Sequence, residues 1–313
     1  MRTVYITPTS AFPRTLPSNT LFGAICSAMA ELGGPVGDLV AAFEEDPPFL
    51  LTSAFPWFGE EEKVHLLPAP ILPPEKLPGE ALFDAAKKLR KVSYLQSGIF
   101  ASLVEGRLSD DEILRDLDRG DGKYRIGSGM LYEKKQDHHF EISRSEIPHN
   151  RINRLSVASE AFFASEGFRF SNAGLYFLID FKEKAWENEV LAALRLLADR
   201  GFGPKVSSGQ GACSISFGDT DILPTSTGER IVTLSRYLPD DFDLLGEDAF
   251  YNLVRIRGRS ADGVMKRSVM MLGEGSVFPD TGDDVYGGIA RVRDDPPVVE
   301  YGYAFPIRFR SAA

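Results

Sequence analysis

Two strand–helix–strand patterns, separated by a long irregular stretch, constrain the fold of this chain most strongly. The first pattern opens with a short apolar strand at residues 3–6. A helix is expected directly after Pro17, with Ser18 as its N-cap and apolar residues spaced along one face. Residues 49–55 then form a plausible second strand.

The second pattern is the clearer of the two. Residues 174–181 form an apolar, aromatic run that is typical of a buried strand. An amphipathic helix is predicted from about 183 to 200, and residues 212–217 give the following strand. The combined order is that of a split βαββαβ unit, the ferredoxin-like arrangement on which RNA-recognition sheets are built.

The rest of the chain suggests an insertion and a second unit. Between the two patterns, residues 59–165 have no single rhythm; they hold a proline-rich segment at 68–78 and a helical pattern at 82–103. A linker-like stretch at 219–229 is followed by runs that read mostly as strands. We therefore predict an α+β protein with tandem ferredoxin-like (RRM-like) domains. They would span residues 1–222, with the insertion at about 59–165, and residues 228–313, which form a smaller strand-rich unit.

Positive charge is concentrated locally although the net charge is −10. Residues 123–154 hold seven lysines and arginines against four acids, together with three of the four histidines. A second cluster comprises Arg255, Arg257, Arg259, Lys266 and Arg267. Each run alone reads as a solvated surface, but their segregation suits a protein that meets RNA on one side and proteins on another.

A glycine-rich loop at residues 201–211 joins the second helix to its strand. Its four glycines leave backbone N–H groups free to face a phosphate, and Lys205 adds a positive charge. The loop has no Walker lysine followed by serine or threonine, and Val206 replaces the third glycine of a dinucleotide fingerprint. Chemistry alone leaves anion binding and a purely structural turn equally open.

This loop matches the RAMP-superfamily signature of glycine, apolar residue, glycine, five residues, glycine, any residue, glycine. Further segments resemble the fourth subunit of the type III-A CRISPR Csm effector complex, in that family's order: residues 16–23, 67–70, 148–154, 174–178, 273–278 and 301–305. The chain departs from the pattern at four positions. An acid is expected where Asn19 and Asn153 stand, and arginine or lysine where Val206 and Gln210 stand.

The resemblance implies a non-catalytic subunit that holds the repeat-derived 5′ handle of the crRNA. It implies contact with the large polymerase-like subunit on one side and with a backbone RAMP subunit on the other, and no cofactor or metal. The basic insertion would carry a hairpin that separates handle from guide, and the helix N-terminus at Ser18 would add an anion site. The RNA-binding residues would be Ser18, Thr20, Lys91, Arg125, His149, Asn150, Arg151, Arg154, Gly203, Lys205, Ser207, Ser208, Gly209, Gln210 and Gly211.

Three rival functions stay open. A metal-independent endoribonuclease that processes CRISPR precursor RNA would use His149 for proton transfer, assisted by Tyr94 or Lys91, although no spacing assembles them. A nucleotide hydrolase would need a loop lysine followed by serine or threonine, which this loop does not have. A protein-only scaffold would leave the glycine loop purely structural. The sequence contains no long apolar span or signal-peptide pattern, so we expect a cytoplasmic protein without membrane contact.

Overall fold

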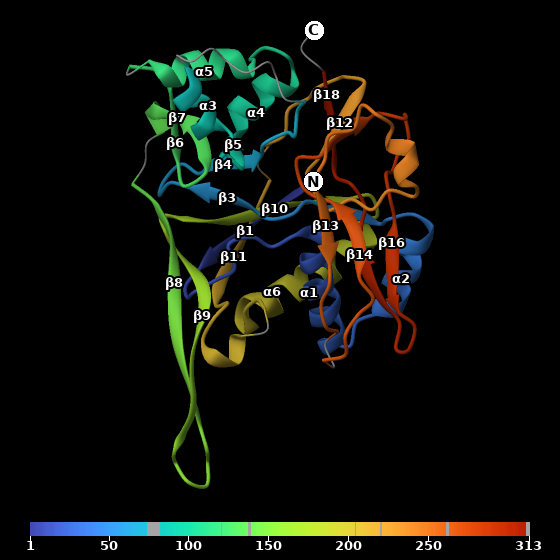
Figure 1. The fold of residues 1–313 in the computed structure, drawn as a ribbon. Helices are drawn as coiled ribbons and strands as arrows, with labels where there is room; N and C mark the ends of the chain where they lie inside the picture. The colour runs from blue at the N-terminus through green and yellow to red at the C-terminus, as the bar shows by residue number, and fades with distance from the viewer. Residues whose placement is uncertain are drawn as a thin grey trace.

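The computed structural model describes residues 1–73, 82–119, 121–136, 139–203, 205–219, 221–260 and 263–310. The fold is mixed α+β and is organised around one large sheet (Figure 1). Its strands pair in the order β11-β1-β10-β3-β4-β5-β7-β6, and β2 also pairs with β10.

Both expected strand–helix–strand patterns are present at one end of this sheet. β10 and β11 each pair antiparallel with β1, which gives the strand order of a split βαβ unit. The helices α1 and α6 pack together below the sheet in Figure 1. The elements are β1 (Arg2–Pro8), α1 (Ser18–Glu31), α2 (Val36–Glu45), β2 (Phe49–Leu51), β3 (Phe55–Phe58), β10 (Ala173–Phe181), α6 (Glu187–Arg200) and β11 (Cys213–Gly218).

The insertion extends the same sheet. β4 (Val64–Pro68) adds to β3, and β5 (Tyr94–Gln96), β7 (Met130–Glu133) and β6 (Tyr124–Gly127) follow in order. The helices of this part are α3 (Phe83–Leu89), α4 (Ser97–Val104) and α5 (Asp110–Asp118).

The prediction of a helical stretch at 82–103 is wrong in its middle. Residues 94–96 leave the helical path because β4 and β7 offer strand edges on either side, and β5 pairs with both. Residues 74–78 of the proline-rich segment lie outside the described residues, as does His138.

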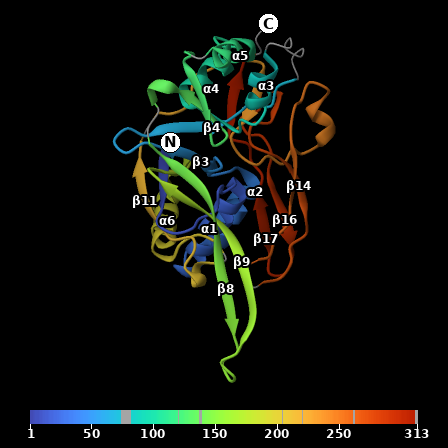
Figure 2. The same cartoon turned by 60° about the vertical axis from the view of Figure 1, so that its left-hand side comes forward.

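Only the last part of the basic zone, from residue 141 on, lies in a long hairpin that projects from the sheet (Figure 2); Lys123, Arg125, Lys134 and Lys135 lie on or beside β6 and β7. β8 (Glu141–Ile152) pairs with β9 (Ser159–Ser171) along its length. Near its base, backbone hydrogen bonds join Phe12 to Phe168 in both directions, at 2.9 and 2.8 Å. Most residues beyond this point are exposed on both faces, which explains why the sequence gives little strand-like alternation there.

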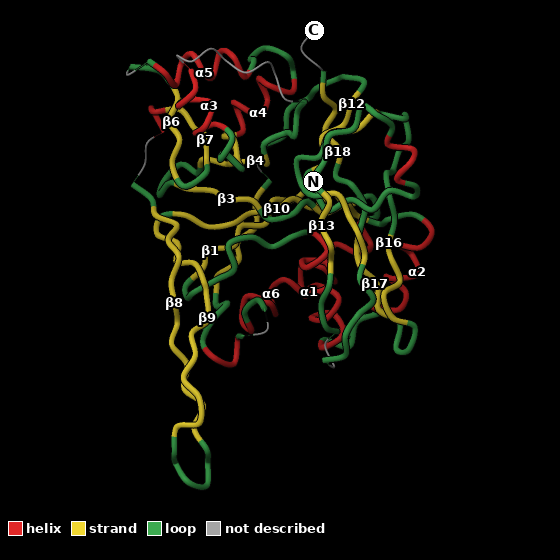
Figure 3. Tube along the Cα trace, in the orientation of Figure 1, coloured by secondary structure: helices red, strands yellow, loops and turns green. Residues whose placement is uncertain are grey.

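The C-terminal residues form small sheets that cover the first unit (Figure 3). One sheet joins β15 (Val277–Pro279), β12 (Arg230–Thr233) and β18 (Pro306–Phe309). Two ribbons join β13 (Leu253–Ile256) to β14 (Val269–Leu272) and β16 (Ile289–Arg293) to β17 (Val298–Tyr301).

The expected second ferredoxin-like unit is not confirmed. Within the described part of residues 228–310, the helical structure is a single 3-10 turn at Phe242–Leu245, and there is no α-helix. The hydrophobic core also crosses the expected domain boundary: the Tyr301 ring lies 5.4 Å from the Phe22 ring of α1, between ring centres. Among the described residues, no helix combines the length and the apolar character that a bilayer span requires.

Candidate nucleic-acid interface

Two of the four loop glycines are required by close backbone approach. The Phe202 N–H donates to the Gly211 carbonyl at 2.9 Å, so the start and end of the loop touch. Both Gly201 and Gly211 have positive φ, at +92° and +81°. A Cβ on Gly211 would lie 2.0 Å from the Phe202 carbonyl oxygen, which no side chain tolerates. These two glycines therefore close the loop.

The other two glycines face open space. Gly203 and Gly209 also have positive φ, but a Cβ at either would meet no atom of the described residues within 4 Å. Lys205 and Ser207 are exposed beside them. The Ser208 hydroxyl is used internally and donates to the Lys205 carbonyl at 2.8 Å. The Ser208 and Gly209 N–H groups donate to the Lys205 and Val206 carbonyls, both at 3.0 Å. What the tip offers a phosphate is therefore the Lys205 side chain, the Ser207 hydroxyl and the open space beside its two glycines.

The hairpin carries its arginines toward its tip. Arg151 and Arg154 are exposed, and Asn150 accepts a hydrogen bond from the Ser159 hydroxyl across the strands at 2.6 Å. In the turn, the Asn153 Oδ1 accepts from the Leu155 N–H at 2.9 Å, while its Nδ2 donates to Glu160 at 2.7 Å. An aspartate at 153 has no proton to donate to Glu160, which accounts for the departure from the expected acid.

Loop and hairpin meet through three side chains. The Gln210 amide Nε2 lies 2.7 Å from the Ser165 hydroxyl of β9, which in turn lies 2.7 Å from Nε2 of His149 on β8. The His149 ring stacks on Phe163, its direct cross-strand neighbour, at 5.1 Å between ring centres. Gln210 and Ser165 are both buried. The structure therefore brings together the glycine-rich loop and the basic insertion, which lie far apart in the sequence.

Comparison with known proteins finds similarity to Csm4 in both sequence and structure. No family model matches the sequence. Csm4 of a CRISPR system from Thermococcus onnurineus (strain NA1) is 27% identical over 316 residues, which cover 97% of this chain and 95% of that protein. A chain in the crystal structure of a Csm3-Csm4 subcomplex of the type III-A CRISPR-Cas interference complex aligns with 99% of this chain and 100% of its own length, with a TM-score of 0.70 and 20% identity. The resemblance to the Csm4 family is confirmed.

A second structural relative supports the same fold. A chain in the crystal structure of a Csm1-Csm4 cassette with cA4 aligns over 99% of this chain and 97% of its own, with a TM-score of 0.63 and 22% identity. At these identities the structural matches establish the fold, and the Csm4 resemblance in sequence runs along nearly the whole chain.

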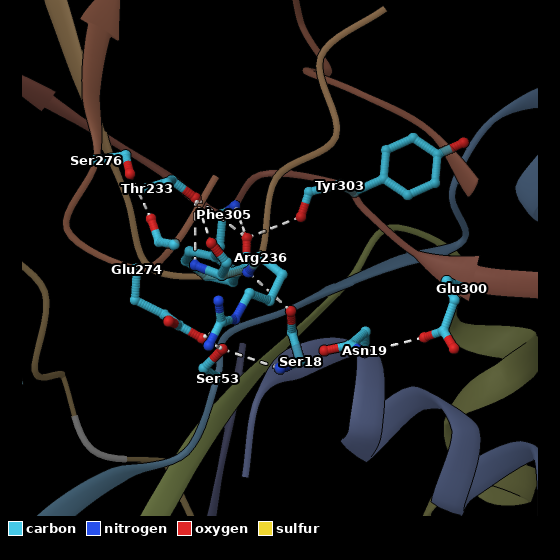
Figure 4. A network of polar contacts seen from close by, with 12 residues as sticks. Ser18, Asn19, Ser53, Thr233, Arg236, Glu274, Ser276, Glu300, Tyr303 and Phe305 are labelled. Atoms are coloured by element: carbon cyan, nitrogen blue, oxygen red, sulfur yellow. Dashed lines mark hydrogen bonds and ion pairs between the residues drawn. The ribbon is translucent and has the colours of Figure 1, made fainter. Parts of the chain in front are cut away.

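The N-terminus of α1, where the Csm4 resemblance implies an anion site, is covered by the chain itself (Figure 4). Ser18 has no exposed surface: its N–H donates to Ser53 Oγ at 2.9 Å, and its own Oγ accepts from the Arg236 N–H at 3.0 Å. Ser18 therefore does not act as the expected N-cap; Pro17 occupies that position without a side-chain bond. Because both polar groups of Ser18 have protein partners, we leave it out of the proposed interface.

Two carboxylates of the C-terminal part lie where an anion was expected. Ser53 donates to Glu274 at 2.6 Å, and Asn19 Nδ2 donates to Glu300 at 2.9 Å. Thr20, one residue further, is exposed. The favourable field of the helix N-terminus is thus already used by acidic side chains of this chain.

The remaining predicted residues lie on the insertion, away from the loop. Lys91 follows α3, and Arg125 lies on β6, the strand at the opposite end of the sheet order from β11; both are exposed. Tyr94 is half-buried, and its ring packs 6.4 Å from Phe55, between ring centres. Burial raises the pKa of Tyr94 to about 12. Among the contacts of the described residues, none joins Tyr94 or Lys91 to His149.

Sequence reasoning missed Arg14, Ser165 and Phe163. The Arg14 guanidinium lies over the Phe168 ring, 5.6 Å from its centre, at the base of the hairpin. The second basic cluster is largely engaged in local structure: Lys266 pairs with the buried Glu300, Arg267 with Asp294 at 2.9 Å, and Arg259 with the Gly263 carbonyl at 2.7 Å. A lone arginine or serine in a loop or strand has no spacing signal, which is why these residues escaped notice.

Proposed function

We propose that this chain is the Csm4-type, RNA-holding subunit of a type III-A CRISPR effector, binding the 5′ handle of the crRNA without catalysing a reaction. The single observation that carries the proposal is the contact between the glycine-rich loop and the basic hairpin. It sets the loop, which carries the exposed Lys205, against Ser165 and His149 of the hairpin, whose outer part carries the exposed Arg151 and Arg154.

Phosphate contacts from lysine, arginine and backbone N–H groups fix the path of an RNA strand without reading its bases. A handle of constant sequence suits this chemistry, because the protein needs only to hold it in register. The proposed RNA-binding set is therefore Asn150, Arg151, Arg154, Gly203, Lys205, Ser207 and Gly209. Thr20, Lys91 and Arg125 are exposed and stay as outlying candidates.

We also propose contact with a large polymerase-like subunit and with a backbone RAMP subunit. The support is by analogy: the structural relatives above are found with Csm1 and with Csm3. Residues 1–222 are proposed as a ferredoxin-like unit, which the sheet order β11-β1-β10-β3 supports. Residues 228–313 are proposed as a strand-rich unit packed on it, in the cytoplasm with the rest of the complex.

The endoribonuclease reading has no specific observation in its favour. His149 already hydrogen-bonds Ser165 and stacks on Phe163, and Tyr94 is half-buried in another part of the sheet with a raised pKa. A tyrosine with a pKa near 12 is a poor proton acceptor at neutral pH.

The test is to purify the tagged chain from its native host and to sequence the RNA that accompanies it. The expected result is a set of RNAs that share one repeat-derived 5′ end, together with the other CRISPR subunits. A matched control is the Lys205→Glu, Arg151→Glu, Arg154→Glu variant, which should recover the protein partners with far less RNA. Recovery of the wild-type chain with neither RNA nor CRISPR subunits would overturn the proposal.

A further inference from the structure

The side chains of Gln210, Ser165 and His149 form a short chain of hydrogen bonds. Gln210 Nε2 is a donor, so Ser165 Oγ accepts from it at 2.7 Å and is left with its own proton to donate. That proton points to His149 Nε2, also at 2.7 Å, which makes this ring nitrogen an acceptor and assigns the ring proton to Nδ1. The 3.3 Å separation of Gln210 Nε2 from His149 Nε2 agrees with the same assignment.

The arrangement leaves these residues few groups to offer to RNA. Gln210 and Ser165 are each 8% exposed, and His149 has one face against Phe163 and its Nε2 against Ser165. The pattern that the chain resembles has arginine or lysine at position 210, but a charge there would be buried next to neutral groups, at a desolvation cost. The neutral amide of Gln210 avoids that cost and donates a hydrogen bond to Ser165.

A second contact supports the same junction from the other side. The loop that follows β1 runs between hairpin and glycine loop: the Gly211 N–H donates to the Ala11 carbonyl at 2.8 Å, and Phe12 pairs with Phe168. Gly167 lies so close to Ala11 that an added Cβ would approach the Ala11 Cβ to 2.9 Å. Backbone hydrogen bonds thus fix the base of the hairpin. The next contact along β9 toward its tip is the hydrogen bond between Ser165 and Gln210.

We propose that Gln210, Ser165 and His149 are positioning residues that hold the β8–β9 hairpin against the glycine-rich loop, so that Arg151, Arg154 and Lys205 form one RNA-binding face. This inference rests on the proposed function for its RNA part, whereas the clamp itself is a property of the free protein. It moves His149 and Gln210 from the predicted RNA contacts to a supporting role.

The clamp is tested by hydrogen exchange on the isolated full chain. Ser165→Thr keeps the hydroxyl and adds a methyl group, and Ser165→Val has the shape of threonine without the hydroxyl, so comparing the two variants isolates the hydrogen bonds. We expect amides of β8 and β9 beyond Ser165 to exchange about tenfold faster in Ser165→Val, with β1 and β10 unchanged and Ser165→Thr close to wild type. Glu166→Gln is the control: Glu166 is next to Ser165 in the sequence and forms an exposed ion pair with Arg144. This variant should leave the exchange rates of the hairpin amides unchanged. Equal exchange in the Val and Thr variants would overturn the clamp.

The RNA part is tested by binding of a 5′-labelled crRNA transcribed from the host's own CRISPR array, over a range of salt concentrations. Ser165→Val carries no charge change, yet we expect it to lower the log–log salt slope by about 1.4, as the Arg151→Gln, Arg154→Gln double variant does, because both arginines leave the RNA together. Adding Ser165→Val to that double variant should change the salt slope little further, because both changes remove the same two arginine contacts. Faster hairpin exchange with an unchanged salt slope would overturn the positioning role. Failure of the wild-type chain to bind this RNA would contradict both the proposed function and the RNA part of the clamp, while the exchange experiment would still decide the clamp.

Discussion

Asn19 in the first turn of α1 donates a hydrogen bond from its side-chain amide to Glu300 of β17 at 2.9 Å. Glu300 is 3% exposed and also pairs with Lys266. The expected acid at position 19 would meet a second buried carboxylate there. The asparagine is therefore explained by a residue 281 positions away, and it joins the two parts of the chain.

The variant Asn19→Asp tests this contact. An acid in the first helical turn gains up to about 1 kcal/mol from the helix dipole. Burial beside Glu300 costs more, so we expect a net loss of about 2 to 4 kcal/mol in the free energy of unfolding at pH 7. Since like charge and burial raise the pKa of the introduced carboxyl group above its unfolded value, the deficit should shrink as the pH falls toward 4. Urea unfolding at pH 7 and 5 measures it. Thr20→Asp, at the exposed neighbour, should change stability by less than about 0.5 kcal/mol; similar losses in both variants would contradict this account.

His65 should make stability depend on pH. Burial, with a smaller contribution from Lys63, lowers the pKa of His65 from its ordinary value of 6.5 to about 4. The unfolded chain then binds a proton that the folded chain does not between these values, so stability is full above pH 6.5 and falls as the pH drops to 4. The loss from this one group is about 2 to 3 kcal/mol. His65→Gln cannot titrate but can still meet the Tyr5 hydroxyl, which lies 2.8 Å from His65 Nε2. Thermal unfolding from pH 4 to 8 should give a flatter curve for the variant; parallel curves would be inconsistent with a buried, neutral His65.

The loop glycines should separate into two classes. Gly211→Ala sets a Cβ 2.0 Å from the carbonyl oxygen of Phe202. We therefore expect the free energy of unfolding to fall by more than about 3 kcal/mol, or the loop to unfold. Gly209→Ala meets open space and carries only the cost of a positive φ, about 1 kcal/mol. The Gly209 N–H already donates to the Val206 carbonyl at 3.0 Å and is not free for a phosphate. RNA affinity should nevertheless fall in Gly209→Ala, because the added methyl group would stand in the open space at the loop tip and hinder the approach of a phosphate. Calorimetric Tm and RNA binding, measured on both variants, check the contrast; a Gly209→Ala chain with wild-type RNA affinity would remove this glycine from the interface.

Lys205 should behave as a single phosphate contact. Lys205→Gln is expected to weaken binding of host crRNA and to reduce the log–log salt slope by about 0.7, the value for one contact on a single strand. Arg115→Gln is the control, because Arg115 pairs with Asp111 on α5, in the insertion. An equal change in slope for both variants would indicate general electrostatics in place of a defined contact.

The sequence predicted those elements of the fold that are determined by residues close to one another along the chain. The apolar run before α6 and the amphipathic face of α6 each have their cause within a few residues, whereas Gly211, predicted as an RNA contact, is required as glycine by the carbonyl of Phe202, nine positions away. The surroundings of Ser18 are determined by a distant residue: its hydroxyl accepts a hydrogen bond from Arg236, 218 positions away, and no residue pattern near Pro17 predicts that contact. The hairpin was foreseen from the resemblance and not from alternation, because its two exposed faces give no hydrophobic period. The 82–103 stretch failed for the opposite reason, since the strand edges that recruit Tyr94 come from elsewhere in the sheet.

The hairpin has the mechanics of a lever. Among the residues that the structure describes, its outermost backbone hydrogen bond to the body is at Phe168. Ser165 lies three residues further out, and the first residue of β9, Ser159, lies nine residues out. At about 3.3 Å per residue these arms are roughly 10 and 30 Å long. A sideways shift of about half an ångström at the Ser165 contact therefore becomes about 1.5 Å at the turn. If the proposed clamp holds, the position of Arg151 and Arg154, the arginines proposed to bind RNA, is set near the fulcrum of this arm, by the hydroxyl group of Ser165.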